Sequence, residues 1–343
     1  MERLRVVITG ASAGIGRAAA VEFARLGARV ALLARGEEGL EGARREVEAA
    51  GGEALVLPTD VADASQVEDA AAEVERAWGG IDIWVNNAMA TVFSPFAEIA
   101  PQDFRRVTEV SYLGAVWGTR AALERMLRAG RGTIVQLGSA LAYRSIPLQS
   151  AYCGAKSALR AFTDSLRCEL ARMQSRVRVT HVVLGAFNTP QFEWARTTIP
   201  RKPRPVGSVL QPELAARAIV RAALQPRREA YVGWGAVQAV LGTMFFPGLL
   251  DRLMARTAWK GQLGAPVDLA GRADNLHSPV RRDFGSHGRF DAEAKKSTLQ
   301  QRLRANPRTL ALLGTAALLA GAALFEIGVR PRSPDSARHF RKA

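Results

Sequence analysis

The feature that most constrains this chain lies in its first 16 residues, where an apolar strand runs into a glycine-rich turn. Leu4–Thr9 (LRVVIT) is rich in β-branched residues, which is typical of a parallel strand buried on both faces. Three glycines follow, Gly10, Gly14 and Gly16, and an alanine-rich helix is predicted over Arg17–Leu26. Such glycines let a pyrophosphate approach the backbone, and the helix N-terminus supplies free N–H groups and a positive dipole. The sequence therefore predicts a nucleotide site in an α/β fold.

Strand and helix patterns alternate along the next 220 residues. Further strands are predicted at Ala28–Ala34, Glu53–Pro58, Ile81–Val85, Thr133–Leu137, Val177–Leu184 and Glu229–Gly233. A long helix over Pro101–Leu127 is expected to be interrupted near Ser111–Gly114. The alternation predicts a Rossmann-like, doubly wound α/β fold over residues 1–235, with a seven-stranded, mainly parallel sheet.

The end of the second strand indicates which dinucleotide is bound. Ala34 stands where a site for NAD would place a carboxylate on the adenosine ribose, and Arg35 follows it. No carboxylate repels a 2′-phosphate there, and a guanidinium pairs well with one. The cofactor is therefore predicted to be NADP(H), with Ser12 and Arg17 as further candidates near the phosphate. The alternative for Arg35 is a solvated arginine at the start of a helix.

A serine, a tyrosine and a lysine carry the candidate chemistry. Ser139 follows a predicted strand, and Tyr152 and Lys156 are spaced i, i+4, so they share one face of a helix. An ammonium beside a phenol lowers the pKa of the phenol toward working pH. The phenol is then able to exchange a proton with an alcohol or ketone whose oxygen Ser139 holds.

Composition excludes several other classes of protein. The formal net charge is +15, but its arginines are scattered, with no recognition helix or zinc-finger spacing, so no nucleic-acid partner is expected. Cys153 and Cys168 are predicted to be free thiols, with Cys153 as a packing residue. His277 and His287 lack a ligand spacing, so no metal site is expected. The N-terminus has no signal-peptide core, which places the catalytic part in the cytoplasm.

Residues beyond 235 are predicted to form an extension in four parts. Residues 236–260 read as an apolar lid or membrane-contact segment broken near Pro247 and Gly248, since no residue from 230 to 250 is charged. A helix spanning the membrane there is the alternative, and it would remove the last strand from the sheet. Residues 261–305 read as a polar linker, 306–330 as a transmembrane anchor around the uncharged stretch 309–325, and 331–343 as a disordered tail. A buried or dimer-contact helix is the alternative to the anchor.

At this point the chain resembles the short-chain dehydrogenase/reductase family over residues 1 to about 235. The matching motifs, in order, are Thr9-Gly10-x3-Gly14-x-Gly16, Asp60, Asn86-Asn87-Ala88, Ser139, Tyr152-x3-Lys156 and Gly185-x3-Thr189. The resemblance implies that Tyr152 is the general acid/base, that Ser139 binds the substrate oxygen, and that Lys156 tunes the tyrosine and holds the nicotinamide ribose. It implies a cofactor site lined by Gly10, Ser12, Gly14, Ile15, Gly16, Asp60, Asn87 and Thr189. It also implies a homo-oligomer.

Three positions depart from the family pattern. Ser111 replaces an asparagine that positions a water in the proton relay, and it is taken here as the fourth catalytic candidate. Met89 replaces a glycine and Leu184 replaces a proline, and both changes bear on the shape of the substrate site. The combined hypothesis is a membrane-associated, NADP(H)-dependent oxidoreductase that interconverts a carbonyl and a secondary alcohol on a lipophilic substrate. The alternatives are a non-catalytic NADP-binding sensor or scaffold, and an epimerase or dehydratase on the same fold.

Overall fold

The computed structural model describes residues 3–297, and the predicted anchor (306–330) and tail (331–343) lie outside them. Seven parallel strands form the central sheet in the order β10-β7-β6-β4-β1-β2-β3. The predicted doubly wound sheet is confirmed, and the order reverses direction next to β1, where such folds bind ligands. The strands are β1 (Arg5–Thr9), β2 (Arg29–Ala34), β3 (Glu53–Pro58), β4 (Ile83–Asn86), β6 (Gly132–Ser139), β7 (Val177–Leu184) and β10 (Glu229–Val232).

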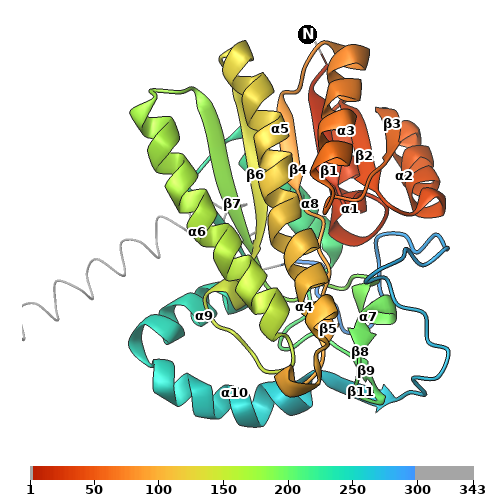
Figure 1. The fold of residues 1–343 in the computed structure, drawn as a ribbon, viewed down its shortest axis with the longest axis vertical. Helices are drawn as coiled ribbons and strands as arrows, with labels where there is room; N and C mark the ends of the chain where they lie inside the picture. Colours follow the sequence, from red (N-terminus) through yellow and green to blue (C-terminus); the bar gives the residue numbers. More distant parts are fainter. Residues whose placement is uncertain (1–2, 298–343) are drawn as a thin grey trace, which may run out of the picture. The chain divides into compact units, whose positions relative to one another are not determined.

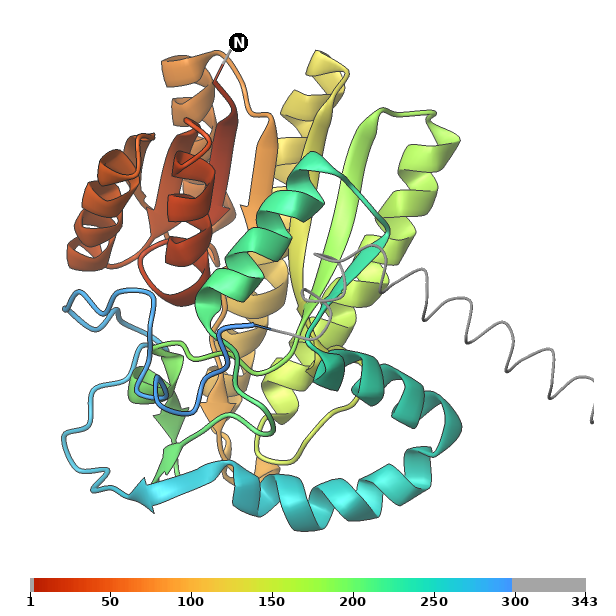
Figure 2. The same cartoon turned by 180° about the vertical axis from the view of Figure 1, so that it is seen from behind.

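Helices cover both faces of the sheet. On one face α1 (Gly14–Ala24), α2 (Glu37–Ala49) and α8 (Pro212–Leu224) share one apolar core with Val6 and Ile8 of β1 (Figure 2). On the other face α3 (Ala64–Trp78), α5 (Gly114–Ala129) and α6 (Ser150–Arg172) pack with Val7 (Figure 1). Successive strand residues thus enter opposite cores, which explains why the strand sequences are apolar throughout.

The predicted break in the long helix is present. Helix α4 (Pro101–Thr108) passes into a π-helical turn, η2 (Glu109–Leu113), before α5 begins. Such turns insert an extra residue into the helical ladder and often lie beside functional sites. Here the turn brings Val110 to the wall of the main cavity.

The apolar stretch after β10 forms two helices. Helix α9 (Trp234–Phe245) and helix α10 (Pro247–Gly261) meet at the predicted break, and β10 keeps its place in the sheet (Figure 1). Within residues 3–297 no helix is long and apolar enough to cross a bilayer. The structure therefore does not contain the alternative span over residues 230–250.

Residues 262–297 differ from the predicted polar linker, because they fold onto the catalytic domain. β11 (Leu263–Pro266) pairs antiparallel with β9 (Arg201–Pro203), and Lys295 donates its N–H to Val209 O at 2.9 Å. Leu276 is fully buried and Phe290 lies against Phe192, with 5.5 Å between ring centroids. A few apolar side chains in a polar sequence hold the segment on the domain. The average composition of the segment is polar, and it therefore does not reveal these side chains.

Two further segments complete this end of the domain. They hold α7 (Gln191–Trp194), β8 (Arg196–Thr197) and β9 after β7, and β5 (Val92–Phe93) after β4. β5 pairs with β8, so the Pro- and Arg-rich stretch after residue 191 is tied to the domain near the carboxyl ends of the strands. Two 3₁₀ turns, η1 (Phe96–Glu98) and η3 (Ala140–Ala142), lie in the same region.

Candidate active site

One cavity lies at the carboxyl ends of the central strands, where parallel α/β sheets bind their ligands. It takes residues from the segments that follow β1, β2, β3, β4, β6 and β7, and from α6. Of the predicted site residues, those that line it are Gly10, Ser12, Gly14, Ile15, Arg35, Asp60, Asn87, Ser139, Tyr152, Lys156 and Thr189. Met89 and Leu184 line it as well. Three predicted residues, Gly16, Arg17 and Ser111, do not line it.

The glycine-rich turn requires its glycines. Gly10 and Gly14 have φ angles of +67° and +59°, in the left-handed region that favours glycine. A Cβ on Gly16 would lie 2.9 Å from the carbonyl carbon of Gly10, so a side chain there would push the helix off the turn. Gly16 therefore contributes by close packing of helix and turn rather than by facing the cavity.

Asn87 braces the glycine-rich turn from the neighbouring strand. Its side-chain amide donates to Thr9 O at 2.8 Å and to Gly10 O at 3.1 Å, while Thr9 Oγ1 accepts the N–H of Asn87 at 3.0 Å. The residue predicted to line the cofactor site thus also fixes its geometry.

Asn86 has a different role, because it ties β4 to the neighbouring strand β6. It lies in a buried network in which its amide donates to Thr119 Oγ1 and Gln136 Oε1, both at 3.0 Å. Its Oδ1 accepts from the indole of Trp84 at 2.8 Å. The paired asparagines therefore face opposite ways, one toward the site and one into the core.

Ser139, Tyr152 and Lys156 come together as predicted. Ser139 ends β6, its hydroxyl accepts the N–H of Leu141 at 3.1 Å, and its side chain lines the cavity together with Tyr152. Lys156 is buried and donates from Nζ to Leu137 O at 2.8 Å. Its Nζ lies 5.7 Å from the centroid of the Tyr152 ring. One strand end and one helix face therefore present all three groups to the cavity.

The pKa values differ from the expectation for this trio. Burial raises the pKa of Tyr152 to about 12, although the nearby hydroxyl of Ser139 lowers it in part. Burial also lowers the pKa of Lys156 to about 8. Burial, and not the ammonium, therefore sets the pKa of the phenol in this structure. The tyrosine holds its proton at neutral pH, which is the state needed to donate it to a carbonyl oxygen.

Ser111 was predicted as a catalytic residue, and its surroundings give it another role. Its side chain is 1% exposed, and its hydroxyl donates to Ala90 O at 2.8 Å and accepts the N–H of Ala90 at 2.9 Å. The hydroxyl thus uses its donor and an acceptor site on the backbone of the loop that follows β4. Ser111 thus ties the π-helical turn to that loop, and its side chain does not reach the cavity.

The adenosine end of the cavity holds the predicted arginine and an acid. The Arg35 guanidinium lines it and donates to His277 O at 3.1 Å, to Leu276 O at 3.3 Å and to Asn275 O. Asp60 is paired with Arg106, and its Oδ1 accepts the N–H of Ala62 at 3.1 Å. Arg35 therefore forms no ion pair with a carboxylate in the described part of the chain.

Arg17 is not available as the second phosphate arginine. Its side chain is 4% exposed and is paired with Glu46 at 2.8 Å and with Asp283. The reason is packing, because Arg17 points from α1 between α2 and the segment that carries Asp283. Sequence alone pointed to Arg17 because it follows the glycines directly, and it gave no sign of the distant partner.

The far C-terminal part of the domain supplies cavity residues that sequence reasoning missed. They are Asn275, Pro279, Val280, Arg282 and Phe284. Their only signal in the sequence is the aromatic pair Phe284 and Phe290 in a polar stretch, which indicates docking on the domain. No cluster of His, Cys, Asp and Glu suited to a metal ion occurs in residues 3–297.

The residues present fit a dinucleotide. The cradle at Gly10 has no room for a Cβ, which would lie 2.9 Å from Ala88 Cα, and the N-terminus of α1 faces the same space. Arg35 and Asp60 lie at one end of the cavity, and Tyr152, Lys156 and Thr189 line it elsewhere. A cofactor in this place would bring its reactive ring to the Ser139–Tyr152 pair.

Comparison with known proteins agrees with this geometry. The family profile described as short chain dehydrogenase matches residues 5–199. The uncharacterized oxidoreductase YxnA of Bacillus subtilis is 35% identical over 259 residues, which are 75% of this chain and 73% of that protein. The 3-dehydrosphinganine reductase of Danio rerio is 33% identical, over 64% of this chain and 68% of its own length. Dehydrogenase/reductase SDR family member 7B of Bos taurus is 34% identical, over 54% and 58% respectively.

Solved structures of similar fold extend over most of the catalytic domain. A metagenomic short-chain oxidoreductase in complex with NADP is 29% identical, with a TM-score of 0.58, and the match covers 68% of this chain and 98% of that one. An alcohol dehydrogenase from Thermococcus sibiricus complexed with 5-hydroxy-NADP is also 29% identical, with a TM-score of 0.57 over 67% and 96%.

Proposed function

Because the chain belongs to the short-chain dehydrogenase/reductase family, we propose that it is an NADP(H)-dependent oxidoreductase interconverting a carbonyl and a secondary alcohol on a lipophilic substrate. The observation that carries the proposal is that Ser139, Tyr152 and Lys156 line the same cavity as the glycine-rich turn. A proton donor and a dinucleotide site therefore share one space, as carbonyl reduction requires.

The roles of the side chains follow from their positions and protonation states. NADPH, when bound, supplies the hydride. Tyr152 gives its phenolic proton to the substrate oxygen, and Ser139 holds that oxygen by a hydrogen bond. Lys156, fixed by Leu137 O, lies beside the phenol and stabilises the negative charge that the tyrosine acquires as it gives up its proton. Thr189 and Lys156 would hold the nicotinamide half of the cofactor.

The preference for NADP(H) rests on the adenosine end of the cavity. Ala34 and Arg35 leave a positive charge and no carboxylate where a 2′-phosphate would lie. The complexes of two similar structures with NADP and 5-hydroxy-NADP support the same assignment. We expect Arg35→Asp to weaken NADPH binding much more than NADH binding. The assignment fails if the unaltered protein binds NADH better than NADPH.

A lipophilic substrate is supported by the surface next to the site. Helices α9 and α10 expose large apolar side chains, among them Met244 (73%), Phe245 (64%) and Leu249 (65%). Two relatives are named as reductases of 3-dehydrosphinganine and of 3-ketodihydrosphingosine, which are two names for one keto compound with a lipid backbone. We therefore include contact of this surface with a membrane in the proposal, as the route by which such a substrate arrives.

The decisive experiment is turnover of NADPH on a panel of ketones of increasing chain length. Tyr152→Phe is expected to lower kcat by about 10²-fold or more with NADPH affinity retained, since a general acid contributes that much. Tyr112→Phe is the matched control, because Tyr112 lies outside the cavity. NADPH binding without turnover on any ketone would favour a non-catalytic sensor instead.

Membrane contact is tested separately by flotation with phosphatidylcholine/phosphatidylserine vesicles. The full chain is compared with a chain ending at residue 304, each with and without Phe245→Ser and Leu249→Ser. Loss of flotation only when both serines are present in the shortened chain supports contact through α9 and α10. Flotation that depends on residues 305–343 alone points to the predicted anchor.

A further inference from the structure

Residues 275–291, here called the strap, run past the adenosine end of the cavity, beneath α1 and α2 in the view of Figure 2. The strap lies outside residues 5–199, which match the family profile. It nevertheless contributes Arg282 and Phe284 to the cavity wall, and Gly285 accepts a backbone hydrogen bond from Gly14 of the glycine-rich turn. A segment in this position will touch whatever binds there.

Resting on the proposed function, we propose that the strap is a cofactor clamp whose Arg282 is, with Arg35, a second cation for the 2′-phosphate of NADP(H). Three features of the strap support this role. The strap is seated at α1, its backbone holds Arg35, and its Arg282 lines the cavity.

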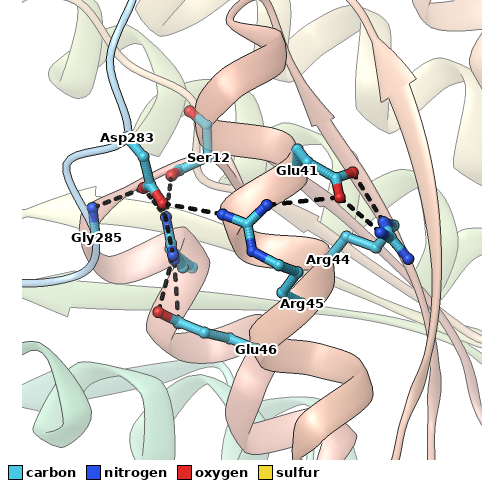
Figure 3. Close-up of polar contacts among 8 residues, drawn as sticks. Ser12, Glu41, Arg44, Arg45, Glu46, Asp283 and Gly285 are labelled. Atoms are coloured by element: carbon cyan, nitrogen blue, oxygen red, sulfur yellow. Dashed lines mark hydrogen bonds and ion pairs between the residues drawn. The ribbon is translucent and has the colours of Figure 1, made fainter.

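The strap is seated at α1 by an ion pair between the exposed Asp283 and the buried Arg17. Asp283 pairs with Arg17, and Arg17 also binds Glu46 at 2.8 Å. Oδ1 of Asp283 accepts the N–H of Gly285 at 3.2 Å (Figure 3). Gly285 O in turn accepts the N–H of Gly14 at 3.0 Å. The first N–H of the phosphate-binding helix is thus bonded to the strap itself.

The other end of the strap holds Arg35. The carbonyl groups of residues 275–277 accept from the Arg35 guanidinium, and Leu276 between them is fully buried. Arg106 donates to Leu276 O at 3.1 Å while it pairs with Asp60. The strap therefore fixes the predicted 2′-phosphate arginine by its backbone, and no carboxylate in residues 3–297 forms an ion pair with that arginine.

Arg282 lies between these two anchors. Its guanidinium carbon is 5.1 Å from the centroid of the Phe284 ring, which packs edge-on against Trp194 at 4.5 Å. Within residues 3–297, Arg282 forms no ion pair, whereas the nearby acids Asp283 and Asp60 are paired with Arg17 and Arg106. Two cations without a carboxylate, Arg35 and Arg282, thus line a cavity whose expected ligand carries a phosphate with a charge of about −1.5 to −2.

The test compares Arg282→Gln with Arg281→Gln in the full chain, because both arginines are exposed but only Arg282 lines the cavity. Dissociation constants for NADPH and NADH are measured by fluorescence titration. Arg282→Gln is expected to weaken NADPH by about tenfold, the loss typical of one charge-assisted hydrogen bond, and to leave NADH unchanged. Equal loss for both cofactors, tighter NADPH binding, or no difference from Arg281→Gln would overturn the assignment of Arg282.

The seating of the strap is tested by Asp283→Asn, with Asp268→Asn as its control, since Asp268 caps an exposed turn in the same part of the chain. Asp283→Asn is expected to speed release of both NADPH and NADH several-fold, and NADP⁺ is expected to slow hydrogen exchange of residues 283–288 in the unaltered protein. Unchanged release and unchanged exchange would refute a clamp. If the unaltered protein binds no NADPH, the proposed function fails; if it binds NADPH well and the variants have no effect, only the clamp fails.

Discussion

Replacement of Gly42 by alanine isolates the contact between the strap and α2. Gly42 lies in the middle of α2, and a Cβ built on it would stand 2.6 Å from Cγ of Asp283 and nearer still to one carboxylate oxygen. Asp283 must therefore turn away, and its pairing with Arg17 must break. The missing side chain of Gly42 is what allows the carboxylate to approach the helix.

Two opposing free energies set the expected result. Alanine is better than glycine inside a helix by about 1 kcal/mol. Loss of Asp283 leaves the buried Arg17 with Glu46 alone, which costs about 1–3 kcal/mol. We expect Gly42→Ala to be neutral or destabilising in the natural chain, but to stabilise by up to about 1 kcal/mol in an Asp283→Ala background. There only the end of the Arg17 side chain, 2.9 Å from the new Cβ, has to shift.

The measurement is the free energy of unfolding in urea for the four chains of this double-mutant cycle. Gly235→Ala in α9 serves as control, because a Cβ on Gly235 meets no atom within 4 Å. The same stabilisation by Gly42→Ala in both backgrounds would refute the reasoning, since it would mean that Asp283 does not occupy the space above Gly42.

Three further predictions concern buried groups. Ser111→Ala should lower the free energy of unfolding by about 1–3 kcal/mol, because both backbone groups of Ala90 lose their partner. Turnover per folded molecule should stay within a small factor of that of the unaltered protein. A loss of turnover like that of Tyr152→Phe would show that Ser111 is a catalytic residue. Alcohol oxidation needs the phenolate of Tyr152, and the pKa of Tyr152 is about 12, so the rate of oxidation should rise with pH from 7 to 10. A plateau of the rate below pH 8 would mean that the bound cofactor or Lys156 lowers the pKa of Tyr152. Burial lowers the pKa of His181 to about 4, so the unfolded chain binds a proton below pH 6.5 that the folded chain does not. About 2 kcal/mol of unfolding free energy should therefore be lost between pH 7 and pH 5, and a His181→Leu chain that shows the same loss would contradict this.

The fold and the centre of the site were predictable because they depend on local patterns. The apolar runs of β1 and β7, the turn from Gly10 to Gly16 and the spacing of Tyr152 and Lys156 are short-range features, and the structure brings them together as expected. Asp60, Asn87 and Thr189 also line the cavity, and their roles in cofactor binding stay predictions.

The features of the site and fold that could not be predicted depend on contacts between distant parts of the chain. The partners of Arg17 and Ser111 lie 266 and 21 residues away, and no local pattern indicates them. The pKa of Tyr152 depends on how deeply the site is buried, which spacing does not describe. The folding of residues 262–297 onto the domain depends on isolated side chains such as Leu276 and Phe290. A homo-oligomer stays a prediction.

The 266-residue separation between Arg17 and Asp283 also has a consequence for biosynthesis. A ribosome makes the glycine-rich turn at the beginning of translation and the strap only after nearly all of the catalytic domain has emerged. Local contacts within the N-terminal half form early, whereas a contact of this separation must wait for the chain to be long enough to close the loop. Nascent chains stalled before residue 283 thus carry an open nucleotide site, and the transition to a closed one marks the end of synthesis of the domain.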